Sequence, residues 1–90
     1  YNNMQAKISI IGAGNVGGQA AHLILQRQLA DVVLLDIVEG LAIGKTLDLE
    51  QSGFIEGYKK KITGTADYRD IKGSQIVLIT AGLTRRPGMD

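Results

Sequence analysis

The sequence predicts an α/β protein whose strands form one doubly wound parallel sheet, and two observations support this prediction. Short apolar segments alternate along the chain with segments in which apolar residues recur at helical spacing. The apolar segments are continuous instead of alternating, as in strands of a parallel sheet that is covered on both faces. Right-handed strand–helix–strand units then predict the strand order 3-2-1-4.

Four short segments are predicted strands, and two longer segments are predicted helices. The strands are expected at residues 7–11, 32–35, 61–65 and 75–80. The first helix is expected at 15–28 and the second at 41–52, where Gly53 is expected to end it. The polar residues 66–72 are expected to connect the third strand to the fourth.

The fourth predicted strand lies at an edge of the predicted sheet, and residues 76–79 within it are all apolar. Stable monomers avoid a long apolar edge strand, because its unpaired backbone groups promote association. We therefore expect an incomplete sheet in a single truncated domain, residues 1–90, from the amino-terminal part of a longer protein. The chain is expected to self-associate or to pair with the missing remainder.

The composition excludes several classes of function. The chain has a formal net charge of +1 and no basic stripe that would attract nucleic acid. It has no cysteine, which excludes disulfides and thiolate ligands for a metal. No apolar run is long enough to span a membrane, and no secretory signal opens the chain. We therefore expect a cytoplasmic protein with no nucleic-acid, membrane or metal partner.

A glycine-rich segment stands where the first predicted strand meets the first predicted helix. It has the pattern G-x-G-x-x-G and consists of Gly12, Ala13, Gly14, Asn15, Val16 and Gly17. The pattern is weak alone, but in this position it is typical of a dinucleotide-binding turn in a Rossmann-type sheet. The first glycine permits a tight turn, the second lets the backbone approach the pyrophosphate, and the third lets the helix pack closely. Free N–H groups and the positive end of the helix dipole then bind the phosphates.

Asp36 follows the second predicted strand, where the dinucleotide-binding pattern requires an acid. Its carboxylate would accept hydrogen bonds from the hydroxyls of the adenosine ribose and would repel a 2′-phosphate. The expected cofactor is therefore NAD and not NADP. A flexible glycine loop and an ordinary acid at a strand end are the alternatives for these two features.

Longer blocks of the sequence resemble the lactate/malate dehydrogenase family, and within it the lactate-dehydrogenase-like bacterial malate dehydrogenases. The resemblance covers residues 7–90. It rests on I-I-G-A-G-N-V-G-G at 10–18, V-V-L-L-D-I-V-E-G at 32–40, G-K-T-L-D-L at 44–49, I-T-G-T-A-D-Y at 62–68 and I-T-A-G-L-T-R-R-P-G-M-D at 79–90. It implies oxidation of L-malate to oxaloacetate by hydride transfer to NAD, with the pyrophosphate on the glycine turn.

The resemblance also implies roles for residues near the end of the chain. Thr80, Ala81 and Gly82 should pass close to the cofactor, where small residues leave room. Arg85 should pair with the distal carboxylate of malate, because a guanidinium matches a carboxylate with two parallel hydrogen bonds. The family's lactate enzymes typically carry glutamine there, so Arg85 favours malate. The alternative is an exposed loop arginine, which is also what we expect Arg86 to be.

The residues that this family uses for chemistry are expected to lie outside the chain. The resemblance implies a histidine–aspartate pair as proton acceptor and a carbonyl-polarising arginine that would follow Asp90 directly. His22, the only histidine, falls within the first predicted helix and is expected to be a surface or packing residue. We therefore expect no catalytic residue in this chain and no activity of the chain alone.

Three other interpretations are open from the sequence. The chain could instead come from a lactate dehydrogenase, from a stand-alone NAD-binding regulatory module, or from a fragment or design made to study folding.

The family's dimers pack through the helix predicted here at 41–52, so the resemblance also implies a homo-oligomer.

Overall fold

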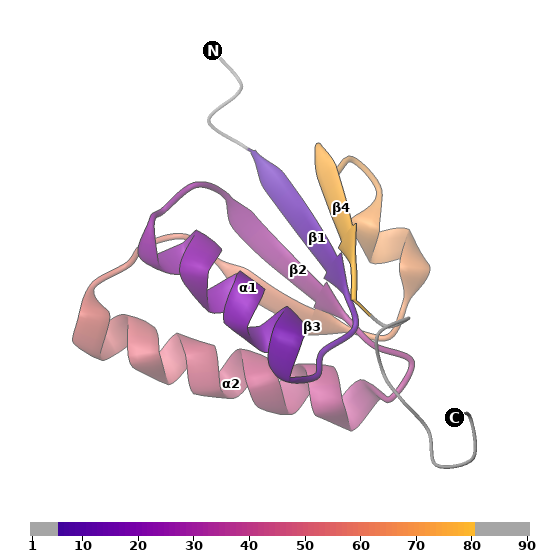
Figure 1. Ribbon diagram of the computed structural model, residues 1–90, viewed down its shortest axis with the longest axis horizontal. Helices are drawn as coiled ribbons and strands as arrows, with labels where there is room; N and C mark the ends of the chain where they lie inside the picture. The colour runs from indigo at the N-terminus through magenta and orange to yellow at the C-terminus, as the bar shows by residue number, and fades with distance from the viewer. Residues whose placement is uncertain (1–5, 81–90) are drawn as a thin grey trace.

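The computed structural model describes residues 6–80, which form a parallel sheet with helices packed against it (Figure 1). The strands are β1 (Lys7–Ile11), β2 (Asp31–Leu35), β3 (Ile62–Thr65) and β4 (Ile76–Ile79), in the order β3-β2-β1-β4. Every pair of neighbouring strands is parallel. The predicted α/β class and strand order are therefore confirmed.

Two helices connect the first three strands. Helix α1 (Asn15–Gln26) joins β1 to β2, and helix α2 (Glu39–Glu56) joins β2 to β3. Figure 1 shows the two helices side by side in front of the strands. The connection from β3 to β4 contains a short 3-10 helix, η2 (Tyr68–Ile71), within the polar stretch 66–72. It returns the chain past β2 to the far side of β1, so the direction of winding reverses between β1 and β4.

The core lies between the two helices and the sheet. Its buried hydrophobic members come from both helices and from β1, β2 and β3, and they include Ile10, Ala21, Ile24, Leu25, Val32, Leu34, Ala42, Leu49 and Ile62. Four consecutive residues of β2 are buried, so its continuous apolar run is covered on both faces, as predicted. Burial of this apolar surface holds each helix against the strands that it connects.

The ends of both helices differ from the predictions. Helix α1 ends at residue 26 instead of 28, and Gln28 has a left-handed conformation with φ of 51°. Helix α2 runs from 39 to 56 instead of 41 to 52, so the prediction that Gly53 ends it was wrong. Gly53 lies within the helix, where a Cβ would approach the Tyr58 ring to 2.9 Å. The helix ends at Gly57, whose φ of 85° is left-handed and whose N–H donates to the Gly53 carbonyl at 2.7 Å.

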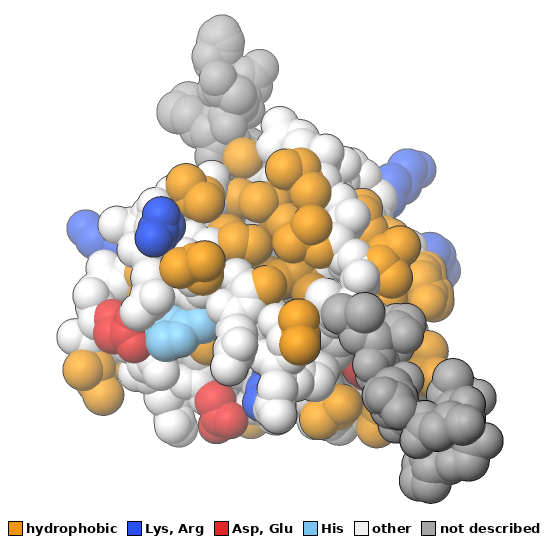
Figure 2. Space-filling model, viewed as in Figure 1, with side chains coloured by type: hydrophobic (Ala, Val, Ile, Leu, Met, Phe, Trp, Pro, Cys, Tyr) orange, Lys and Arg blue, Asp and Glu red, His pale blue; other side chains and the backbone are white. Residues whose placement is uncertain are grey.

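Strand β4 forms one edge of the sheet, as predicted, and its apolar side chains are exposed. The exposed fractions of Ile76, Val77, Leu78 and Ile79 are 50, 42, 38 and 69%. Figure 2 shows hydrophobic side chains gathered on this face of the molecule, in the region of β1 and β4. Large exposed apolar patches of this kind mark contact surfaces.

Candidate functional site

A cavity of about 510 Å³ opens at the carboxyl ends of β1 and β2, beside the residue that follows β4. Its lining comes from the glycine turn, from the start of α1, from the β2–α2 connection and from the end of β4: Gly12, Gly14, Asn15, Val16, Gly17, Asp36, Ile37, Val38, Leu41 and Thr80. In open α/β sheets, ligands bind at the carboxyl ends of the strands where the winding direction reverses. The cavity lies at this place in the fold.

The glycine turn joins β1 directly to α1, as the sequence predicts. Gly12 has a φ of 109°, a left-handed conformation that glycine adopts without steric cost. Gly14 is the N-cap of the helix, and the N–H of Gly18 donates to its carbonyl at 2.8 Å. The N–H groups in the first turn of an α-helix have no carbonyl partner inside the helix. Together with the helix dipole, they make this end of α1 attractive to an anion.

Gly17 and Gly14 have opposite surroundings. A Cβ on Gly17 would overlap the carbonyl oxygen of Gly12 and would lie 3.2 Å from the Thr80 hydroxyl. The missing side chain therefore lets α1 pack against the end of β1, which is the task that the sequence pattern assigns to the third glycine. A Cβ on Gly14 would meet no protein atom within 4 Å. Its missing side chain instead leaves the backbone accessible from the cavity.

Asp36 is half-buried and its carboxylate joins two loops. Its Oδ2 accepts a hydrogen bond from the Ala13 N–H at 2.8 Å, and its Oδ1 accepts one from the Val38 N–H at 2.9 Å. The bond to Val38 is a local side-chain turn, typical of aspartate at the end of a strand. The bond to Ala13 spans 23 positions in the sequence and was not predicted.

Thr80 lines the opposite side of the turn from Asp36. Its N–H donates to the Ile11 carbonyl at 2.8 Å, which continues the pairing of β4 with β1. Its hydroxyl lies 3.1 Å from the Ile11 carbonyl oxygen and 3.0 Å from the Gly12 carbonyl oxygen, and its single proton is shared between these two acceptors. The other predicted residues of this segment, Ala81, Gly82 and Arg85, lie outside the described residues.

Ala13 differs from the other predicted residues of the turn. Its side chain is fully buried in the core, and its N–H is already bonded to Asp36. The structure therefore brings its backbone to the turn but leaves its side chain out of the cavity lining. Three apolar residues that sequence reasoning missed, Ile37, Val38 and Leu41, form one wall of the cavity and are 79, 57 and 41% exposed. Ile37 and Val38 directly follow the acid, and this position was the available signal.

His22 lies outside the cavity lining, in agreement with the expectation that it is a surface or packing residue. Its Nε2 lies 3.0 Å from a carboxylate oxygen of Glu56, at the end of α2. Gln26 Nε2 donates to the same carboxylate at 2.9 Å. The bonds from Gln26 and His22 hold the pKa of Glu56 below its ordinary value of 4.5. Because the folded-state pKa is lowered, this link between the helices stabilises the fold above pH 4.5 and is lost as the pH falls through the lowered pKa.

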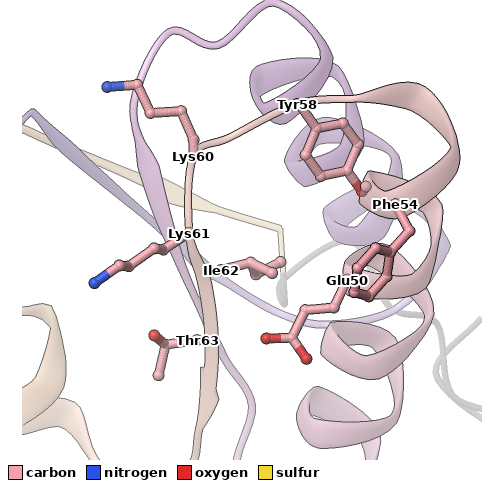
Figure 3. Close-up of a pocket in the computed structure, with 8 residues that line it drawn as sticks. Glu50, Phe54, Tyr58, Lys60, Lys61, Ile62 and Thr63 are labelled. Carbon is pink, nitrogen blue, oxygen red and sulfur yellow. The ribbon is translucent and has the colours of Figure 1, made fainter.

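A larger cavity, of about 730 Å³, lies between the carboxyl-terminal half of α2 and β3 (Figure 3). The aromatic rings of Phe54 and Tyr58 lie on one side of it, and the ammonium groups of Lys60 and Lys61 point away from them. Its polar groups therefore do not converge on one point, as they do in a binding site. We assign the candidate site to the smaller cavity, where the glycine turn, the helix end and the acid meet.

Within residues 6–80, no three histidine, cysteine, aspartate or glutamate residues lie together in a way that could hold a metal ion. Neither of the two α-helices in this region is long and apolar enough to cross a membrane.

The chain is similar to known proteins in both sequence and structure. Residues 6–90 match the family described as lactate/malate dehydrogenase, NAD binding domain. The malate dehydrogenase of Roseiflexus sp. (strain RS-1) is 58% identical over 86 residues, which are 96% of this chain and 28% of that protein. The malate dehydrogenase of Cryptosporidium parvum has a similar structure, with a TM-score of 0.86 and 45% identity over 94% of this chain and 27% of that one.

The lactate dehydrogenase of Cryptosporidium parvum is similar to about the same degree. Its structure with lactic acid and nicotinamide adenine dinucleotide has a TM-score of 0.85 and 46% identity, over 93% of this chain and 26% of that one. The chain thus spans between 26 and 28% of the length of these three relatives. Because the family match covers the sheet, the glycine turn and Asp36, the chain belongs to the lactate/malate dehydrogenase family and represents its NAD-binding domain.

Proposed function

We propose that the chain is the NAD-binding part of a malate dehydrogenase, which oxidises L-malate to oxaloacetate. One observation carries this proposal: the glycine turn and Asp36 line the same cavity where the winding of the sheet reverses. The relatives named malate dehydrogenase support the choice of substrate. The substrate-binding part of such an enzyme would belong to the remaining length of those relatives.

The residues around the cavity fit a dinucleotide. The N–H groups at the start of α1 would bind the pyrophosphate, which would come closest to the accessible backbone of Gly14. Asp36 would accept hydrogen bonds from the ribose hydroxyls, because a carboxylate has about four acceptor positions and the backbone uses two here. Ile37 and Val38 would contact the adenine ring. When bound, NAD supplies the carbon atom that accepts the hydride.

Arg85 is our proposed determinant of substrate choice. A guanidinium would form two parallel hydrogen bonds with the second carboxylate of malate, whereas over the methyl group of lactate it would be left without a partner. Lactate dehydrogenase is the second candidate function, and the similarity to a lactate dehydrogenase at 46% identity favours it. Arg85 distinguishes the two candidates, because lactate offers only one carboxylate.

The chain itself is proposed to be inactive. Malate oxidation releases a hydroxyl proton, and a general base must lie within hydrogen-bonding distance of that proton. The single histidine of the chain, His22, is bonded to Glu56 and lies outside the cavity lining.

The cytoplasmic location expected from the sequence stays a prediction.

Two glycine substitutions separate cofactor binding from folding. Gly14→Ala places a methyl group in the cavity without touching other parts of the protein, so we expect NAD binding weakened by about tenfold or more. Stability should fall by less than about 1 kcal/mol, because alanine is a poorer N-cap than glycine. Gly17→Ala collides with the Gly12 carbonyl, so we expect the free energy of unfolding to fall by about 1–3 kcal/mol. Calorimetric titration with NAD and urea unfolding measure the two effects.

Gly44→Ala is the matched control for both variants. Gly44 lies within α2, and a Cβ there would meet nothing within 4 Å. We expect a gain in stability of about 0.5–1 kcal/mol, because alanine loses less backbone entropy in a helix. NAD binding should be unchanged. If Gly14→Ala bound NAD as tightly as this control does, the pyrophosphate would not lie against the turn.

The whole reaction is tested by joining this chain to the remaining part of the Roseiflexus malate dehydrogenase. We expect the joined protein to reduce NAD with malate in preference to lactate. Arg85→Gln should lower kcat/KM for malate by on the order of a hundredfold or more, because the distal carboxylate loses a bidentate partner. Arg86→Gln is the control and should have little effect. A preference for lactate in the unsubstituted protein would establish the second candidate instead.

We further propose that two exposed apolar surfaces form contacts in the complete protein. The β4 edge would pair with the remainder of the chain, which would extend the sheet. Helix α2 would contact a second copy, through Leu47, Phe54 and Ile55, which are 54, 93 and 87% exposed. The implied dimer of the family through this helix supports the second contact.

Without the remainder, the β4 edge is expected to make the chain self-associate. Sedimentation velocity at rising concentration should show dimers or larger species. Val77→Lys puts a charge on the edge and should reduce this association, whereas Leu47→Lys on α2 tests the other surface. A chain that stays monomeric at high concentration would exclude both contacts as drivers of association.

A further inference from the structure

Side chains from outside the glycine turn hold it on both sides. From the side of β2, the Asp36 carboxylate accepts a hydrogen bond from the Ala13 N–H at 2.8 Å. From the side of β4, the Thr80 hydroxyl lies 3.0 Å from the Gly12 carbonyl oxygen, to which it donates. The two bonds act on successive residues of the turn.

The turn needs such support, because glycines have more backbone freedom than other residues. Gly12 has a φ of 109°, one of several conformations that are open to a glycine. Ordering each residue costs about 1–2 kcal/mol of conformational entropy. If that ordering took place only on binding, it would reduce the affinity for the phosphates. A turn that is already ordered avoids this loss.

The bond to Asp36 also determines which N–H groups remain for a ligand. It occupies the N–H of Ala13, whose side chain is fully buried. The groups available to an anion are then those at the start of α1, in line with the helix dipole. Asp36 therefore acts on the phosphate-binding turn in addition to facing the cavity itself.

We propose that Asp36 and Thr80 are positioning residues, which hold the glycine turn in its phosphate-binding shape before the cofactor arrives. The proposal rests on the proposed function, since it assumes that this turn binds the pyrophosphate of NAD. It gives Asp36 two tasks, recognition of the ribose and support of the turn. A substitution that removes the charge of Asp36, made so that the 2′-phosphate of NADP is no longer repelled, would therefore also loosen the turn. It would weaken the binding of both NAD and NADP.

Inorganic pyrophosphate is the probe that separates these two tasks, because it contains no ribose. If Asp36 only recognised the ribose, loss of its negative charge next to the turn would leave pyrophosphate binding unchanged or would strengthen it. If Asp36 supports the turn, the same loss weakens the binding of an anion. Weaker binding of pyrophosphate is therefore expected only if Asp36 supports the turn.

The role of the Thr80 hydroxyl is tested by two substitutions whose side chains are similar in size to threonine. Thr80→Val removes the hydroxyl donor and should weaken the binding of both pyrophosphate and NAD by about tenfold, the effect of one hydrogen bond. Thr80→Ser keeps the donor and should retain most of the affinity. Equal pyrophosphate binding by Thr80→Val and the unsubstituted chain would overturn the proposal for Thr80. Circular dichroism shows whether each variant is folded.

Asp36 is tested without any ligand, by hydrogen exchange of the Ala13 amide. Asp36→Ala removes both carboxylate oxygens, so no side-chain acceptor remains for the Ala13 N–H. We expect the exchange of the Ala13 amide to become at least about tenfold faster, while the core amide of Leu34 is unaffected. Pyrophosphate should bind more weakly. An unchanged Ala13 exchange rate, or stronger pyrophosphate binding, would overturn the proposal for Asp36.

These readouts distinguish failure of the inference from failure of the proposed function. If the unsubstituted chain bound neither NAD nor pyrophosphate, the proposed function would fail. The exchange rate of Ala13 would still decide whether Asp36 supports the turn. If the Thr80→Val variant did not fold, the Asp36 measurements would decide the proposal.

Discussion

The close approach of α1 to the end of β1 is the constraint on which the rest of the site depends. Gly17 lies against the Gly12 carbonyl, where a Cβ would overlap the carbonyl oxygen. Any larger residue would push the start of the helix away from the strand. The dipole effect of a helix end falls off within about one turn, so such a displacement would remove the N–H groups from reach of an anion. The absence of one side chain thus places the positive end of the helix.

The parallel register of the sheet brings the other components to the same place. The last residues of β2 and β4 are both partners of Ile11, the last residue of β1. The residues that follow these strands, Gly12, Asp36 and Thr80, therefore meet at one edge. The carboxylate and the hydroxyl can then bond to neighbouring residues of the turn. Residues far apart in the sequence form one site because three strands end together.

The sequence predicted the strands and the turn because both depend on local patterns, and the strand order because right-handed strand–helix–strand units restrict it. Continuous apolar runs marked the strands, and glycine spacing marked the strand-to-helix junction. The end of α2 was not predictable in this way, because Gly53 and Gly57 look alike in sequence. They differ in that Gly53 packs against the Tyr58 ring whereas Gly57 has a left-handed φ. The bond between Asp36 and Ala13 was also missed, since it depends on the register between two strands and not on spacing.

The central claim is that backbone N–H groups at the start of α1 bind the pyrophosphate of NAD while Asp36 faces its ribose. The most direct measurement is the change in backbone amide NMR signals of this chain during titration with NAD. The largest changes are predicted at Gly14 to Gly17 and next to Asp36, and NADP should cause weaker ones. Changes confined to the cavity between α2 and β3, with the turn unaffected, would contradict the claim.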